Sequence, residues 1–144
     1  MSDAPEDSAE GDDARVLRPP GWAPPRGYSD GMVAAGRHVA LAGQVGWNPA
    51  TGAFEHADMA GQVAQALRNV AALLAEAGAA PRHLVRLTWY VTDRSAYLEA
   101  RREIGRAYRE IIGMHYPPMT VVVVSGLVEE LALVEIEATA VVPG

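Results

Sequence analysis

The sequence contains no cysteine and no lysine, and each absence removes a class of chemistry. Without cysteine there is no disulfide, no thiolate nucleophile and no Cys-ligated zinc or iron–sulfur cluster. Without lysine there is no side-chain amine for a Schiff base or for covalent attachment of pyridoxal phosphate. Any catalysis must therefore rely on carboxylates, hydroxyls, imidazoles or backbone groups.

Several familiar motifs are also missing. No G-x-S-x-G, G-x-x-x-x-G-K-[ST] or G-x-G-x-x-G pattern occurs, which disfavours serine hydrolysis and phosphate-loop binding. The histidines are widely spaced, with no H-x-H or H-E-x-x-H pattern among them. They are His38, His56, His83 and His115. We therefore expect neither a metal site nor a cofactor.

Basic charge is in deficit, and long apolar runs are lacking. Twelve arginines against 18 acidic residues give a formal net charge of -6, which argues against the basic patch that nucleic-acid binding requires. No segment approaches the roughly 18 consecutive apolar residues of a membrane span, and the acidic N-terminus is unlike a signal peptide. We expect a cytoplasmic protein that binds neither nucleic acid nor membrane.

The residues that are present fit one folded domain preceded by an arm. Residues 1–27 are rich in Asp, Glu and Pro, with little apolar content, which predicts a disordered arm. The domain is then expected over residues 28–144. Its first β patterns, residues 32–35 and 38–45, flank Gly36-Arg37, which predicts an antiparallel hairpin.

Helices and further strands follow in alternation. Apolar residues spaced by three and four predict a helix capped by Asp58 and ended by Gly78, and a second helix opened by Asp93 or Ser95 and ended by Gly113. Strands are expected over 84–91, from about Thr120, and over 131–142. This order predicts an α+β sheet with both helices on one face. The unbroken apolar run 121–124 predicts burial on both faces, and hence oligomerisation through the sheet.

The last strand pattern places two carboxylates on one face. Strict alternation puts Glu135 and Glu137 on the same side of the strand. Two interpretations remain open from the pattern alone: a solvated sheet face, or acid–base groups acting on water. Earlier in the chain, Gly43 would allow a ligand to approach the main chain closely.

Four ordered segments resemble a known family: AGQVGWNPATG, QVAQALRNVAALLAEAG, LVRLTWYVTD and VEIEATAVV. On these segments the chain, from about Tyr28 to its end, resembles the RidA/YjgF family of reactive intermediate deaminases. The resemblance implies a chorismate-mutase-like α+β fold with a mixed sheet and two helices on one face. It also implies a homotrimer with a central barrel and a small-molecule ligand in each inter-subunit cleft.

The resemblance also implies roles for individual residues. Glu135 matches the glutamate that positions the attacking water, and Tyr28 matches an early tyrosine of the cleft. Gly43 matches the glycine whose backbone faces the ligand, and Ala42 replaces the usual serine beside it. Trp47 is our preferred pocket residue among several aromatic side chains that indicate an apolar pocket.

The chain departs from the family pattern at its carboxylate-binding position. Where the family has P-x-R-[ST], this chain has Met119 followed by Thr120, so methionine replaces the arginine. By the resemblance we expect Met119 and Thr120 to bind the substrate together with Ala42, Gly43 and Trp47. A charge-assisted bond from arginine is worth about 1.5 to 3 kcal/mol, and methionine cannot supply it. Gly105 replaces the family's helix asparagine. We interpret four nearby arginines as a solvated helix face; they are Arg101, Arg102, Arg106 and Arg109.

Two functions compete on this evidence. We favour an imine or enamine deaminase-like hydrolase acting on a specialised intermediate rather than on generic 2-iminobutanoate, with Glu135 and Tyr28 as catalytic residues. The alternative is a non-catalytic trimer that binds a hydrophobic metabolite or partner in the same cleft, because Met119 and Gly105 replace polar groups. The nuclease role also claimed within the family fits poorly with an acidic protein that lacks lysine.

Overall fold

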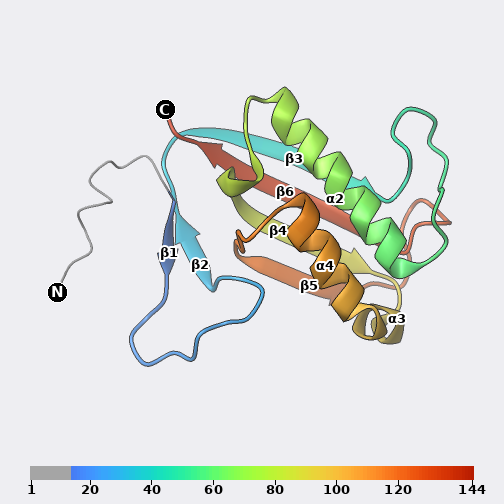
Figure 1. Cartoon of the computed structure of the whole chain (residues 1–144), viewed down its shortest axis with the longest axis horizontal. Helices are drawn as coiled ribbons and strands as arrows, with labels where there is room; N and C mark the ends of the chain where they lie inside the picture. The colour runs from blue at the N-terminus through green and yellow to red at the C-terminus, as the bar shows by residue number, and fades with distance from the viewer. Residues whose placement is uncertain (1–13) are drawn as a thin grey trace.

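The computed structural model describes residues 14–144, so residues 1–13 of the predicted acidic arm lie outside the described residues. Figure 1 shows a sheet with helices across one face and a small two-stranded sheet beside it. The elements are β1 (Arg15–Leu17), β2 (Gly31–Val33), β3 (Arg37–Val45), α2 (Met59–Glu76), a 3-10 turn η1 (Pro81–His83), β4 (Leu84–Val91), α3 (Arg94–Glu99), α4 (Arg101–Ile111), β5 (Met119–Val123) and β6 (Val134–Val142).

The main sheet is mixed and has the strand order β3-β6-β4-β5. Strand β6 pairs antiparallel with β3 on one side and with β4 on the other. Strands β4 and β5 run parallel, as expected where a helical crossover, here α3 and α4, connects them. The predicted α+β class, with a mixed sheet and helices on one face, is confirmed.

The core lies between the helices and that face. Helix α2 begins at its N-cap Asp58, whose carboxylate accepts a hydrogen bond from the Gly61 N–H at 3.0 Å. Its inward stripe has fully buried Val63, Leu67 and other apolar side chains, packed with Ile136 of β6 and neighbouring strand residues. Because alternate residues of β6 are buried in this way, the residues between them point to the opposite, open face.

Two predictions about the N-terminal part are wrong. Strand β2 pairs with β1 rather than with β3, so the expected hairpin does not form. Strand β3 pairs instead with the nine-residue β6, which offers a longer apolar partner. Gly36 allows this arrangement, because a Cβ there would lie 2.1 Å from the Val142 carbonyl oxygen. The arm prediction is also wrong for residues 15–17, which form β1.

The second predicted helix is in fact two. The chain breaks at Ala100 (φ -91°, ψ 3°), which ends α3 and caps α4. The final strand begins at Val134, so Leu131, expected within it, precedes it and is 68% exposed. The valines of β5 are not buried on both faces within one chain; Val123 is 53% exposed on this edge strand. Among the described residues, no helix is long and apolar enough to span a membrane.

Candidate functional site

The predicted site residues fall into two groups on opposite faces of the main sheet. Glu135 and Gly43 lie on the open face, which the helices do not cover. Tyr28 and Met119 line a larger cavity on the helix side, beside α4. One copy of the chain therefore does not bring the two groups together.

A β-bulge shapes the open-face group. In the pairing of β3 with β6, Leu41 faces Ala138 and Gln44 faces Ile136, so Ala42 and Gly43 share a single partner position. A bulge leaves one residue outside the hydrogen-bonded ladder and turns its neighbours away from regular geometry. The expectation that a ligand approaches the main chain at this glycine remains a prediction.

Glu135 lies directly against Gly43. A Cβ built on Gly43 would be 2.1 Å from the Glu135 Oε2 atom, so only glycine leaves room for the carboxylate. Glu135 is half-buried and lines two adjoining cavities of about 300 and 280 Å³. Trp47 lines the second of these with Gly43, so the preferred pocket tryptophan lies on the Glu135 side.

The two carboxylates of β6 differ in their hydrogen bonds. The Tyr90 hydroxyl donates to Glu137 Oε1 at 2.6 Å, and this bond raises the pKa of Tyr90 above its ordinary value. Glu135 accepts no hydrogen bond from any residue in the range 14–144. Glu137 is thus engaged in the sheet, while Glu135 keeps its oxygens available for water or a ligand.

Buried polar contacts hold the end of β3 that carries Trp47. Asn69 of α2 donates from Nδ2 to the carbonyls of Val45 (3.2 Å) and Trp47 (3.0 Å). The Trp47 ring lies 5.8 Å, centroid to centroid, from the Phe54 ring. Because Asn69 is almost fully buried, these bonds fix the main chain that follows the bulge.

On the helix side, Tyr28 is positioned by its neighbour. Ser29 donates from its hydroxyl to the Tyr116 carbonyl, and its N–H donates to the Pro117 carbonyl at 3.2 Å. These bonds tie the segment before β2 to the segment before β5. Tyr28 consequently lies at the larger cavity together with Met119.

The larger cavity, of about 620 Å³, is aromatic and contains arginines. Within it, Tyr108 is stacked with Tyr116 at 5.4 Å between ring centroids, and its hydroxyl donates to the His115 carbonyl at 2.7 Å. Burial raises the pKa of Tyr108, so its phenol stays neutral. The lining residues are Arg26, Gly27, Tyr28, Trp89, Tyr97, Arg101, Ile104, Gly105, Tyr108, Arg109, Tyr116, Met119 and Val121.

The four α4 arginines are all exposed, as expected for a solvated helix face, but two of them also border a cavity. Arg101 and Arg109 line the larger cavity, whereas Arg102 and Arg106 do not. The signal was available in the sequence, because residues 101, 105 and 109 recur every four positions and so share one helix face. The missing information was that this face borders a cavity.

Two other predicted contacts lie outside both groups. Ala42 and Thr120 are exposed and line neither the Glu135 cavities nor the larger one. Thr120 follows Met119 on β5 and therefore points to the other face of the strand. Their substrate-binding roles remain predictions. Within residues 14–144 no group of three or more potential ligands is arranged to hold a metal ion.

Comparisons with known proteins agree with the fold. The family model described as "Endoribonuclease L-PSP" matches residues 21–142. A RutC family protein of Haemophilus influenzae is 35% identical over 109 residues, which cover 76% of this chain and 82% of the relative.

Solved structures extend the similarity to most of the chain. A protein of unknown function of the conserved Rid family from Yersinia pestis superposes with a TM-score of 0.80 at 32% identity, over 90% of this chain and 99% of that one. The YjgF gene product of E. coli superposes with a TM-score of 0.63 at 32% identity, over 79% of this chain and 87% of that one. The fold is thus the chorismate-mutase-like one expected, and the chain belongs to the RidA/YjgF family.

Proposed function

We propose that this chain is an imine or enamine deaminase-like hydrolase whose active site is completed by two copies of the chain. The observation that carries the proposal is the state of Glu135. It is a carboxylate that receives no hydrogen bond from residues 14–144, and it lies against the Gly43 main chain on the open sheet face. A carboxylate placed in this way can accept a proton from water and return it to a nitrogen.

The proposed reaction is the hydrolysis of a carbon–nitrogen double bond. Water held by Glu135 adds its oxygen to the imine carbon, and Glu135 takes the proton that water loses. Glu135 returns that proton to the nitrogen, which gives a tetrahedral carbinolamine. The hydroxyl group of the carbinolamine then passes its proton to the nitrogen by way of Glu135, the carbon–nitrogen bond breaks, and the products are a carbonyl group and ammonia. An imine and one water thus give a carbonyl compound and one ammonia. Tyr28 of a second copy would contact the substrate from the other side of the cleft.

A homotrimer with a central barrel is the proposed assembly. Apolar side chains are exposed on the open face, including Val122 (38%) of β5 and Val128 (98%), which lines a cavity with Glu135. Contiguous exposed apolar groups of this kind mark interaction surfaces. Packing three open faces together would cover the sheet, and it would bring Glu135 of one copy towards Tyr28 and Met119 of the next.

The proposal is tested by generating imines in situ from amino acids with an L-amino-acid oxidase and catalase. The loss of imine is followed by chemical trapping, with 2-iminobutanoate compared with the imine of phenylalanine. We expect faster loss of the phenylalanine imine, and Glu135→Gln to slow it by about a hundredfold or more. Glu130→Gln, which removes the same charge from an exposed residue outside these cavities, should retain activity. Equal rates for Glu135→Gln and the parent would contradict the proposal.

One observation favours a second candidate, a non-catalytic binding protein. Met119 lies within a cavity lined by aromatic side chains, and by the motif resemblance it stands where the family carries its carboxylate-binding arginine. Such a cavity could hold a stable apolar molecule without turning it over. Saturable ligand binding with no imine loss for any amino acid tested would support this candidate instead.

A further inference from the structure

The larger cavity has a charge opposite to that of the whole protein. The chain carries a formal charge of -6, yet the described residues that line this cavity include Arg26, Arg101 and Arg109 and no carboxylate. A cationic cavity in an acidic protein selects for anions, because the local field acts at short range while more distant charges are screened by salt.

The Arg109 side chain lies beside Gly105, one turn earlier on α4. A Cβ added to Gly105 would lie 3.4 Å from Arg109 Nη1, so the guanidinium reaches back one turn over the glycine. Arg109 makes no hydrogen bond or ion pair with any residue in the range 14–144. An unpaired guanidinium beside a cavity is suited to bidentate binding of a carboxylate.

A second, independent observation points to a ligand in the same place. Trp89 lines this cavity and is 3% exposed, and its indole Nε1 is buried without a hydrogen-bond partner. Among residues 14–144 it is the sole buried side-chain nitrogen or oxygen in that state. Buried donors are normally paired, so an unpaired one at a cavity wall indicates an acceptor that arrives with a ligand.

We infer that Arg109, assisted by Arg101, supplies from helix α4 the anion-binding group that Met119 cannot supply, and that the ligand is a carboxylate with an aromatic body. The carboxylate lies against the helix arginines. The ring packs among Tyr28, Met119 and their aromatic neighbours, where an acceptor atom can reach Trp89. The inference rests on the proposed function for the reaction, whereas the anion site itself is tested by binding alone.

The test uses the indole N–H signals in a nitrogen–proton NMR spectrum of the whole protein. Trp89→Phe identifies the Trp89 signal among the three tryptophans. The protein is titrated with 3-phenylpropanoate, with its uncharged amide, and with propanoate, which lacks the ring. We expect 3-phenylpropanoate to shift the Trp89 signal, and each of the other two compounds to bind about tenfold more weakly or worse.

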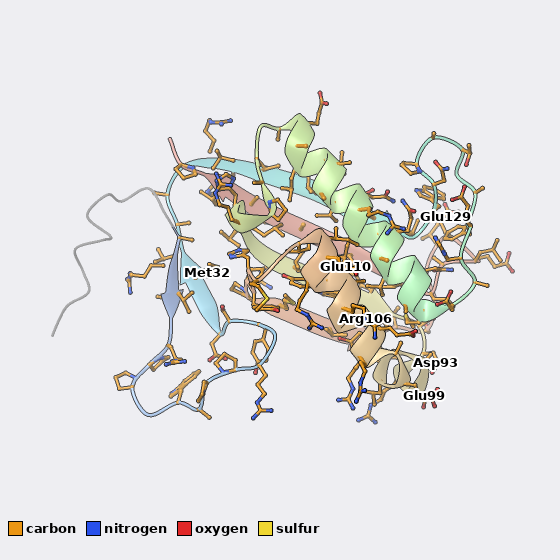
Figure 2. The ribbon with its side chains drawn as sticks, in the orientation of Figure 1. Met32, Asp93, Glu99, Arg106, Glu110 and Glu129 are labelled. Atoms are coloured by element: carbon orange, nitrogen blue, oxygen red, sulfur yellow. The ribbon has the colours of Figure 1, made fainter. Side chains whose placement is uncertain are left out.

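Variants of one helix provide the matched comparison. Arg109→Gln should weaken binding of 3-phenylpropanoate by about tenfold or more, and Arg101→Gln should also weaken it. Arg106→Gln, on the same helix (Figure 2) but outside the cavity, should bind within about twofold of the parent. Equal effects of Arg106→Gln and Arg109→Gln, equal binding of the amide, or an unmoved Trp89 signal would overturn the inference.

Failure of this inference is distinguishable from failure of the proposed function. Binding that depends on Arg109, in a protein whose imine turnover does not depend on Glu135, refutes the hydrolase and supports the anion site. If turnover depends on Glu135 but carboxylate binding is unchanged in Arg109→Gln, the anion site is refuted and the hydrolase is not.

Discussion

Glu135 and Glu137 share one face of β6, yet their surroundings give them different chemistry. Glu137 accepts a hydrogen bond from the Tyr90 hydroxyl, whereas Glu135 accepts none from residues 14–144 and packs on the Gly43 main chain. The hydrogen bond holds Glu137 against the sheet, whereas the Glu135 oxygens remain open to a ligand. In the proposed mechanism, Glu135 therefore depends on a glycine of the adjacent strand for its position.

Gly43→Ala is predicted to impair catalysis. Its Cβ would lie 2.1 Å from Glu135 Oε2, so the carboxylate must move away. Because a displacement of about 1 Å can cost about a hundredfold, we expect imine turnover to fall by about that factor. The comparison variant is Gly126→Ala, where an added Cβ meets nothing within 4 Å. Unchanged turnover in Gly43→Ala would contradict this placement of Glu135.

At the scale of elements, α4 carries a glycine that its own stability does not require. Gly105 lies within α4 and has no positive φ, so nothing in its backbone conformation demands glycine. Glycine within a helix costs about 0.5 to 1 kcal/mol relative to alanine. Gly105 lines the larger cavity beside Arg109, and its missing side chain leaves space there. That space comes at a cost in helix stability.

Gly105→Ala is accordingly predicted to stabilise the protein by about 0.5 to 1 kcal/mol in urea unfolding. The new methyl group would meet only the end of the flexible Arg109 side chain, at 3.4 Å. The opposite sign is expected for Gly78→Ala, because Gly78 has φ +73° at the end of α2. A destabilised Gly105→Ala variant would show that α4 is constrained in another way.

The elements that could be predicted from the sequence are those determined by local residues. Helix α2 was placed correctly because its cap, its apolar spacing and its terminal glycine are all within one segment. The pairing of β2 with β1 and the break at Ala100 were missed, because both depend on packing between distant segments. Identifying Glu135 required the family resemblance, since alternation alone could not separate it from Glu137.

The two half-sites could not be predicted from the sequence either. The sequence predicts that Trp47 and Met119 both bind the substrate, but within one copy of the chain they lie on opposite faces of the sheet. The unpaired Trp89 nitrogen depends on what packs around it, and no sequence pattern records that.

For the whole molecule, three tyrosines should set the alkaline limit of stability. The pKa of Tyr90 is raised by its hydrogen bond to Glu137, and the pKa values of Tyr97 and Tyr108 are raised mainly by burial. The folded state therefore holds these protons more tightly than the unfolded state. The contribution of these tyrosines to the free energy of unfolding is complete below the ordinary tyrosine pKa of 10.0. It is lost as the pH rises through the higher pKa values of the folded state.

We therefore expect the free energy of unfolding to change little between neutral pH and about pH 9, and to fall above about pH 10. Tyr108→Phe should be less stable at neutral pH by about 0.5 to 1.5 kcal/mol, because it loses the bond to the His115 carbonyl. It should also lose stability less steeply at alkaline pH. Urea unfolding at a series of pH values checks both statements, and an unchanged slope would contradict the role given to Tyr108.

In the proposed trimer, each active site joins Glu135 of one copy to the larger cavity of another. This arrangement is tested by mixing two inactive variants, Glu135→Gln and Gly105→Trp, the second of which fills that cavity. After the variants are unfolded and refolded together, random trimers should contain intact sites at about a quarter of the parent number, and imine turnover should return to about that level. A mixture that remains as inactive as each variant alone would contradict a site shared between copies.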